Sequence, residues 1–262
     1  MVDFSLTPRQ KELREIAMEY ATAVVEPIAI QSDQMPEVDK SFNWDLVREA
    51  SIRGLRTLSI PERFGGEGAD VLTLAMCGEC IAYGDLGVAV AFDQTWKIMT
   101  AIANLCNEEQ QNRWIPRIME DDEFLLGIPV TEPLAGSDNL LPYDAPGSGV
   151  QMLAKRKGDK WLLNGTKRYI SNGGLAKMYY VLARTDPDGP LSTSLTGFLV
   201  PSDVPGFSVP EVWDKMGQRA VQNGTLVFED VEIPDRDRVG DIGASLPAVG
   251  ALLLGFGSNI QA

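Results

Sequence analysis

The hydrophobic residues of the first 120 positions recur at helical spacing. The first predicted helix begins at Thr7 and Pro8, which suit an N-cap and a first-turn position. Pro27 predicts its end. Its apolar face steps by one, three or four positions: Leu13, Ile16, Ala17, Tyr20, Val24, Val25 and Ile28. Similar patterns predict further helices over about 44–55, 71–83, 86–106 and 108–119, with a glycine-rich turn at 61–70.

Near residue 123 the pattern changes to short β-rich runs separated by Gly, Asp, Asn and Pro. Gly158-Asp159 predicts a hairpin turn between two of the runs. Helices followed by strands, without strand–helix alternation, indicate an α+β protein: an all-helical domain, then a mostly antiparallel, β-barrel-like middle domain. No G-x-G-x-x-G follows a strand, so nicotinamide binding has no support. The predicted strands cover 124–130, 150–157, 160–171, 178–185, 195–201 and 224–233.

The last twenty or so residues are again apolar, with a pattern that favours a helix. The segment 244–262 carries no charge and could nearly span a bilayer, but its proline and three glycines favour a buried segment. We therefore expect three parts: a helical domain over 1–122, a middle β-domain over 123–240, and over 241–262 the start of a C-terminal helical domain. We expect that domain to continue past Ala262 or to be completed by another subunit.

Composition narrows the possible chemistry. The chain has 262 residues, with 23 basic against 37 acidic side chains and a net charge of −14, which argues against a nucleic-acid or anionic-membrane surface. Histidine is absent. This excludes Ser-His-Asp and Cys-His nucleophiles within the chain, together with histidine metal sites, and no metal is expected.

Cys77 and Cys80 form a C-x-x-C motif inside an apolar, helical run, and Cys106 stands alone. A redox or zinc pair would need a second pair or a strand–helix–strand setting. We expect buried thiols and, because the start of the chain resembles no signal peptide, a reducing cytoplasm.

Two polar segments carry candidate chemistry. In 131–138 small residues stand beside hydroxyls, which suits either a tight loop or backbone N–H groups that approach an anionic cofactor. In 164–173 Tyr169 and Ser171 alternate along a strand, so a ring and a hydroxyl share one face. That pair suits either an ordinary half-buried strand or a planar heterocycle.

Taken together, the two segments resemble the acyl-CoA dehydrogenase family. Thr-Glu-Pro-x-Ala-Gly-Ser-Asp at 131–138 is followed by Leu-Asn-Gly-x-Lys at 163–167 and aromatic-Ile-hydroxyl-Asn-Gly at 169–173. Further motifs follow in family order, and the resemblance covers essentially the whole chain. They are Ile-Pro-Glu-Arg-Phe-Gly-Gly at 60–66, Asn-Glu-Glu-Gln-Gln at 107–111, Ala-Arg-Thr-Asp at 183–186, Gly-Phe-Leu-Val-Pro at 197–201, Lys-Met-Gly-Gln-Arg at 215–219 and Phe-Glu-Asp-Val at 228–231.

The resemblance implies an FAD enzyme that oxidises acyl-CoA thioesters and passes electrons to an electron-transferring flavoprotein. Thr131 would bond to the pyrimidine edge of the flavin, Tyr169 would stack on the ring, and Ser171 would reach flavin N5. Ser137 would lie near the FAD pyrophosphate and the pantetheine arm of the substrate. The full set implied to bind cofactor is Ile128, Val130, Thr131, Gly136, Ser137, Tyr169, Ile170 and Ser171. Gln94 and Met99 are candidates for the far end of the acyl chain.

The resemblance also places the catalytic glutamate in a C-terminal helical domain, beyond Ala262, so no catalytic residue is assigned; Glu132 and Glu229 are interpreted as structural. Family members assemble as dimers or tetramers, so we expect a homo- or hetero-oligomer. Three residues depart from the family pattern: Pro129, Leu134, and Tyr169 in place of tryptophan. They keep two alternatives open, a non-catalytic subunit of a hetero-oligomer and a flavin oxidase on the same scaffold.

Overall fold

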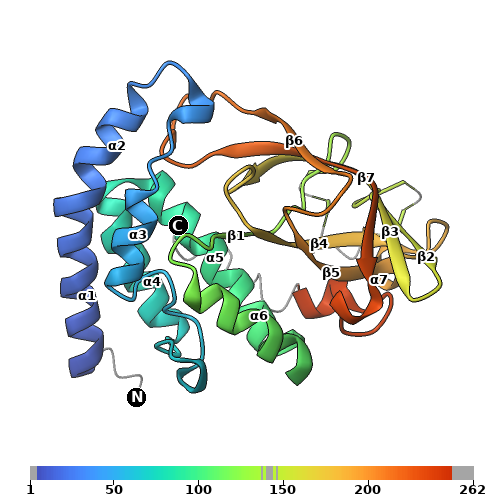
Figure 1. Cartoon of the computed structure of the whole chain (residues 1–262), viewed down its shortest axis with the longest axis horizontal. Helices are drawn as coiled ribbons and strands as arrows, with labels where there is room; N and C mark the ends of the chain where they lie inside the picture. Colours follow the sequence, from blue (N-terminus) through green and yellow to red (C-terminus); the bar gives the residue numbers. More distant parts are fainter. Residues whose placement is uncertain (1–4, 137, 140–143, 146, 250–262) are drawn as a thin grey trace.

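The computed structural model describes residues 5–136, 138–139, 144–145 and 147–249, with helices gathered on one side and strands on the other (Figure 1). The helices are α1 (Pro8–Tyr20), α2 (Glu26–Asp33), α3 (Asp45–Ile52), α4 (Val71–Gly84), α5 (Leu86–Leu105), α6 (Glu108–Glu120) and the short α7 (Leu191–Ser194). Five of these helices lie close to the ranges that the apolar pattern predicts, whereas those over 26–33 and 191–194 are not predicted by it. Single 3-10 turns cover Val38–Lys40, Glu62–Phe64 and Asp235–Asp237.

Polar side chains at the helix starts satisfy the first free N–H groups. Thr7 and Gln10 form a capping box at α1, and Asn107 and Gln110 form another at α6. Asp70 caps α4 by accepting from the N–H of Thr73. These starts are set by local sequence.

The sequence predicts that the first helix ends at Pro27, but in the structure the helical segment continues past this residue. A π-helical turn (Ala21–Val25) follows α1, and the chain continues through α2 to Asp33. Pro27 occupies the first turn of α2, where its missing N–H matters least. The wider π turn re-registers the backbone ahead of the proline, which explains why the helix persists.

In the described residues eight strands form one sheet in the order β6-β7-β3-β2-β4-β5-β8, with β1 paired to β4. The strands are β1 (Leu126–Gly127), β2 (Leu153–Lys157), β3 (Lys160–Ser171), β4 (Met178–Arg184), β5 (Leu195–Pro201), β6 (Phe207–Val212), β7 (Asn223–Pro234) and β8 (Arg238–Val239). Lys157 pairs with Lys160, which confirms the predicted two-residue turn at Gly158-Asp159.

The α+β class is confirmed, but the sheet is open and mixed where a barrel-like one was expected. The order ends at β6 and β8, which do not pair with each other, so two edges remain. Strand β4 pairs in parallel with β1 and β2, while the other ladders are antiparallel. The predicted strand over 124–130 shrinks to β1, because Pro129 has no N–H for the ladder.

Strand β6 is not predicted from the sequence; it is an edge strand with a proline at 210, and none of its side chains is buried. What makes this segment a strand is its pairing with β7. A pattern of neighbouring residues does not reveal such a pairing between separate segments.

Three apolar clusters fill the part of the molecule that the structure describes. One lies within the helices, one beneath the sheet, and the third joins the two parts. In the third, Ile98 and Ile102 of α5 and Trp114 of α6 pack against Met178 and Tyr180 of β4. Helices and sheet therefore share buried surface, and the segments between them are held firmly.

Candidate functional site

The segment that follows β1 runs beside β3. The carbonyl of Thr131 accepts from the N–H of Arg168 at 2.8 Å. The chain then turns tightly, because Glu132 and Ala135 exchange backbone hydrogen bonds of 2.9 and 3.3 Å. Leu134 occupies this turn with a side chain that is 91% exposed, so a large residue there displaces nothing in the described part of the chain.

A buried ion pair holds this turn to the sheet. The Nζ of Lys167 lies 2.7 Å from Oε1 of Glu132, and the two side chains are 0% and 4% exposed. The Glu132 carboxylate also accepts from the N–H groups of Gln151 at 2.6 Å and Met152 at 3.1 Å. Burial lowers the pKa of Lys167, and the neighbouring Glu132 opposes that shift. The pair ties three segments together, as expected of a structural carboxylate.

Ser137 lies outside the described residues. Next to it, the N–H of Gly136 donates to Oδ1 of Asp138 at 3.0 Å, and Gly149 donates to the other oxygen at 2.9 Å. These backbone N–H groups hold the pKa of Asp138 below its usual value. A Cβ added to Gly136 would meet nothing within 4 Å, so open space adjoins this residue.

Tyr169 does not sit in the regular strand that the sequence predicts. The β3–β7 register shifts between Lys167 and Ile170, and Tyr169 has a φ of +60°. The extra residue is a β-bulge, which re-aims side chains. Ile170 is buried at 3%, whereas Tyr169 is 52% exposed and Ser171 is half-buried. The bulge therefore places Tyr169 and Ser171 on a backbone that simple alternation along a strand does not predict.

Thr131 and Ser171 are both half-buried residues with hydroxyls that solvent can reach. Neither hydroxyl has a hydrogen-bond partner among the described residues. Partly buried hydroxyls without partners cost free energy unless a ligand or solvent satisfies them. With the exposed ring of Tyr169 and half-buried Ile128 and Val130, they fit a flat heterocycle edged by carbonyl and nitrogen acceptors, which is the chemistry of a flavin.

Asn172 was not singled out from the sequence. Its Nδ2 donates to the carbonyls of Ala91 in α5, at 2.9 Å, and Leu126 in β1, at 2.8 Å. Asn172 is fully buried with a φ of +59°, a conformation that asparagine tolerates. It fixes the end of β3, immediately after Ser171, to the helices.

The two residues suggested for the acyl chain do not share a face of α5, since five positions correspond to about 140° around a helix. Met99 is buried at 2% in the cluster that joins helices and sheet, and Gln94 is half-buried. Asp93 and Lys97 form a buried ion pair on the same helix, which was not predicted from the sequence. Burial raises the pKa of Asp93, although Lys97 counteracts the shift.

Cys77 and Cys80 lie buried within α4, and Cys106 is buried after α5, which confirms the prediction of buried thiols. Burial raises the pKa of Cys77 and of Cys106 to about 12, so neither thiol ionises readily. Among the helices of the described residues, none has the length and apolar character needed to cross a membrane. Most of the uncharged segment 244–262 lies outside the described residues, which reach 249.

The family model for the acyl-CoA dehydrogenase N-terminal domain matches residues 7–122, and that for the acyl-CoA dehydrogenase middle domain matches residues 127–231. The chain therefore belongs to the acyl-CoA dehydrogenase family, which confirms the resemblance seen in the sequence motifs.

Individual proteins that the chain resembles are also acyl-CoA dehydrogenases. The chain is 31% identical over 245 residues to a probable medium-chain specific acyl-CoA dehydrogenase 2, mitochondrial, of Caenorhabditis briggsae; the match covers 93% of this chain and 57% of that protein. Butyryl-CoA dehydrogenase from Megasphaera elsdenii is similar in structure, with a TM-score of 0.86, 28% identity, and coverage of 98% of this chain and 65% of that one.

A glutaryl-CoA dehydrogenase from Mycobacterium smegmatis, solved in complex with FADH2, has a TM-score of 0.80 and 25% identity, with coverage of 97% of this chain and 61% of that one. The chain spans less than two thirds of the length of the curated relatives it matches.

Proposed function

We propose that this chain supplies the helical and flavin-binding parts of an FAD-dependent acyl-CoA dehydrogenase. The observation that carries the proposal is the set of partner-free hydroxyls of Thr131 and Ser171 beside the exposed ring of Tyr169. Membership of the family and similarity to a relative solved with FADH2 support the choice of flavin. We also propose the division into 1–122, 123–240 and 241–262.

In this proposal Thr131 donates to the pyrimidine edge of the flavin and Ser171 to the N5 side, while Tyr169 covers the ring. Ile128, Val130 and Ile170 border the ring, and Gly136 and Ser137 lie toward the diphosphate. The chemistry that FAD supplies when bound is acceptance of the substrate's β-hydrogen as hydride. The protein's own share is orientation of the ring and exclusion of water by the apolar borders.

The substrate would be an acyl-CoA thioester that enters between helices and sheet, near Gln94 and Met99. A carboxylate beyond Ala262 would take the α-proton. Electrons would pass to an electron-transferring flavoprotein, and the active form would be an oligomer. Three reduced, buried cysteines support a cytoplasmic location.

The first test is titration of the purified chain with FAD, followed by flavin absorbance. Ser171→Ala should weaken binding about tenfold, the worth of one hydrogen bond to the ring. Ser208→Ala, at an exposed serine of β6, is the matched control and should bind as the unaltered chain does. A chain that takes up no FAD would refute the proposal and favour a non-catalytic subunit.

The second test uses the flavin-loaded protein without oxygen. Bleaching of the flavin by an acyl-CoA supports the dehydrogenation reaction. Reoxidation by an electron-transferring flavoprotein and not by oxygen supports a dehydrogenase, whereas fast reoxidation by oxygen alone favours an oxidase.

A further inference from the structure

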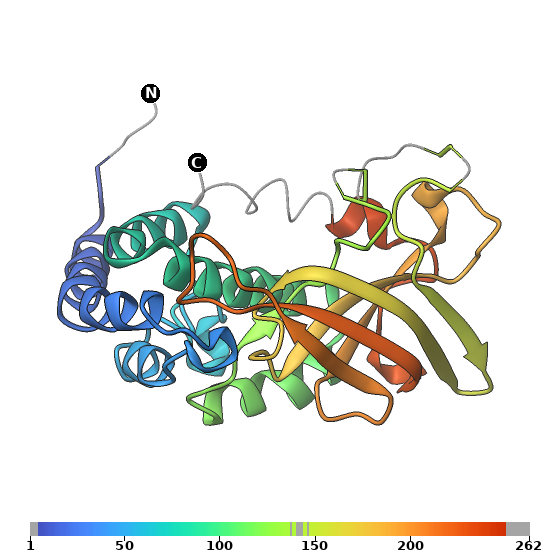
Figure 2. The same ribbon diagram turned by 90° about the horizontal axis from the view of Figure 1, so that it is seen from above.

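The connection between β6 and β7, residues 213–222, leaves the sheet and reaches the helices (Figures 1 and 2). We name it the strap. Ala220 of the strap is buried in the helical core. The strap also lies against the start of α5, where a Cβ on Gly87 would come within 3.1 Å of the Cα of Gln218. The strap therefore contacts the helical part of the chain at two points.

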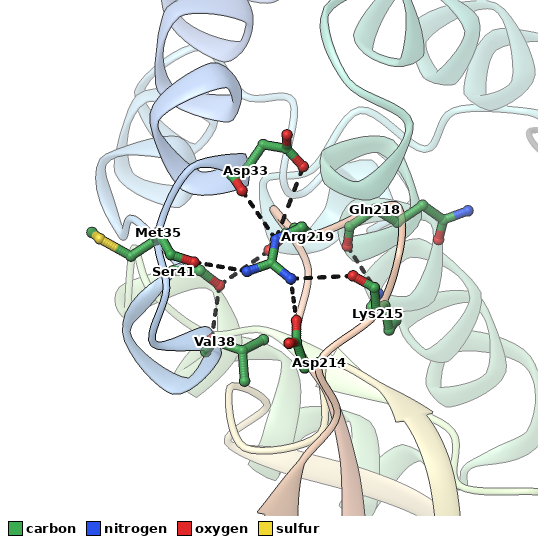
Figure 3. Close-up of polar contacts among 8 residues, drawn as sticks. All are labelled: Asp33, Met35, Val38, Ser41, Asp214, Lys215, Gln218 and Arg219. Atoms are coloured by element: carbon green, nitrogen blue, oxygen red, sulfur yellow. Dashed lines mark hydrogen bonds and ion pairs between the residues drawn. The ribbon is translucent and has the colours of Figure 1, made fainter.

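Arg219 fastens the strap to the end of α2 (Figure 3). Its Nε donates to the carbonyl of Asp33 at 3.1 Å, and one terminal nitrogen donates to the carbonyl of Met35 at 2.7 Å. The other terminal nitrogen binds the Asp214 carboxylate and the Lys215 carbonyl. The Arg219 side chain is only 14% exposed, so these bonds are shielded from water.

Further bonds stiffen the strap. Ser41 Oγ donates to the carbonyl of Arg219 at 3.1 Å, and Gln222 Nε2 donates to the carbonyl of Asp39 at 2.9 Å. Lys215 Nζ donates to the carbonyl of Gln218 within the strap at 2.9 Å and to Oδ1 of Asn223, the first residue of β7, at 2.8 Å. A segment held at this many points keeps a single position.

The first residue of the strap, Trp213, packs against Tyr169. Their ring centroids are 4.7 Å apart, with 50° between the ring planes. The Arg168 guanidinium lies over both rings, at 4.6 Å from Trp213 and 5.3 Å from Tyr169. The indole N–H donates to Thr225 Oγ1 at 3.0 Å, which fixes the orientation of Trp213.

The backbone of Tyr169 is held from the same place. Asn223 Nδ2 donates to the carbonyl of Tyr169 at 3.0 Å, and the carbonyl of Asn223 accepts from the N–H of Trp213 at 2.8 Å. Without these contacts, a half-exposed tyrosine on a bulge would rotate freely and order only on binding a ligand. Trp213 removes that freedom in advance.

We propose that Trp213 is a positioning residue for the cofactor site: it holds the ring of Tyr169 in the orientation that stacks on a flavin, and Arg219 keeps Trp213 in place through the strap. The inference rests on the proposed function. It also explains how a tyrosine serves where most of the family has tryptophan, because a second aromatic side chain restores the rigidity that the smaller ring lacks.

The test compares FAD dissociation constants, measured from flavin absorbance, for five variants. Trp213→Leu should weaken binding about 3- to 10-fold, the worth of one aromatic pair, and Trp213→Phe should recover most of the loss. Tyr169→Leu should weaken binding, and adding Trp213→Leu to it should cause little further loss. Trp44→Leu is the control, since Trp44 forms an aromatic pair with Phe42, 5.1 Å between centroids, that includes no residue of the strap.

Visible circular dichroism of the bound flavin gives a second signal. It should change in Trp213→Leu, return in Trp213→Phe and stay unchanged in Trp44→Leu, although both leucine variants lose an aromatic pair. Arg219→Ala should shift binding and dichroism in the direction of Trp213→Leu, whereas Arg9→Ala, at an arginine bound to Glu67 and Glu12, should not.

Additive losses in the double variant, or unchanged binding and dichroism in Trp213→Leu, would overturn the inference and leave the proposed function intact. Failure of the unaltered chain to bind FAD would overturn both. Should Trp213→Leu not fold, Arg219→Ala compared with Arg9→Ala still decides the matter through binding and the dichroism signal.

Discussion

Removing one charge from the buried pair of Glu132 and Lys167 should cost more stability than breaking an exposed ion pair of the same type. Glu132→Gln leaves the Lys167 ammonium fully buried without its counter-charge, and its remaining acceptors are one amide oxygen and the carbonyl of Val130 at 3.5 Å. It also leaves the N–H groups of Gln151 and Met152 to share one amide oxygen. Breaking one side of a buried pair costs about 3–5 kcal/mol.

Lys167→Met should cost less, about 2–3 kcal/mol, because the two backbone N–H groups still solvate the carboxylate. The double variant should lose less than the sum of the single losses, since no charge then remains buried. Urea unfolding followed by circular dichroism gives these differences. In a domain of this size, a loss of 3 kcal/mol corresponds to a fall in Tm of about 6–12 °C.

Lys160→Met is the matched control, because Lys160 lies on the same strand and pairs with Glu232 at 2.9 Å while both side chains are more than 40% exposed. An exposed pair contributes about 0–1 kcal/mol. The reasoning is wrong if Glu132→Gln destabilises no more than Lys160→Met, or if the losses in the double variant simply add.

Three further predictions concern single side chains. Asn172→Ala should lower the free energy of unfolding by about 2 kcal/mol in urea titrations, since the buried carbonyls of Ala91 and Leu126 lose their donor; a loss near zero would contradict this. Burial lowers the pKa of Lys215 to about 8, so an NMR titration of its side chain, assigned with Lys215→Met, should show a midpoint there and not near 10.5. Hydrogen bonds from the Thr73 hydroxyl and N–H lower the pKa of Asp70, so its ionised form stabilises the fold above about pH 4 and this contribution is lost as the pH falls through the lowered value. Asp70→Asn should therefore flatten the fall in unfolding free energy between about pH 4 and pH 2, and an unchanged slope would refute the assignment.

The sequence by itself determined the features that depend on neighbours along the chain. The helix starts at Thr7 and Asn107 follow from capping residues three positions before a glutamine. The hairpin at Gly158-Asp159 follows from a glycine between two strand-like runs. In the structure this glycine has a φ of +64°, which favours glycine. The collinear motifs were also sufficient to recognise the family, because each is a short local string.

Only the tertiary structure decided what depends on partners far away in the chain. The identity of β6 as a strand, the bulge at Tyr169 and the open, mixed order of the sheet all come from pairing between distant segments. The contact between Trp213 and Tyr169 joins residues more than 40 positions apart, and no periodicity along the chain encodes it. Local preferences are set by backbone sterics and side-chain spacing, whereas such contacts exist only once the buried surface of the whole fold brings them together.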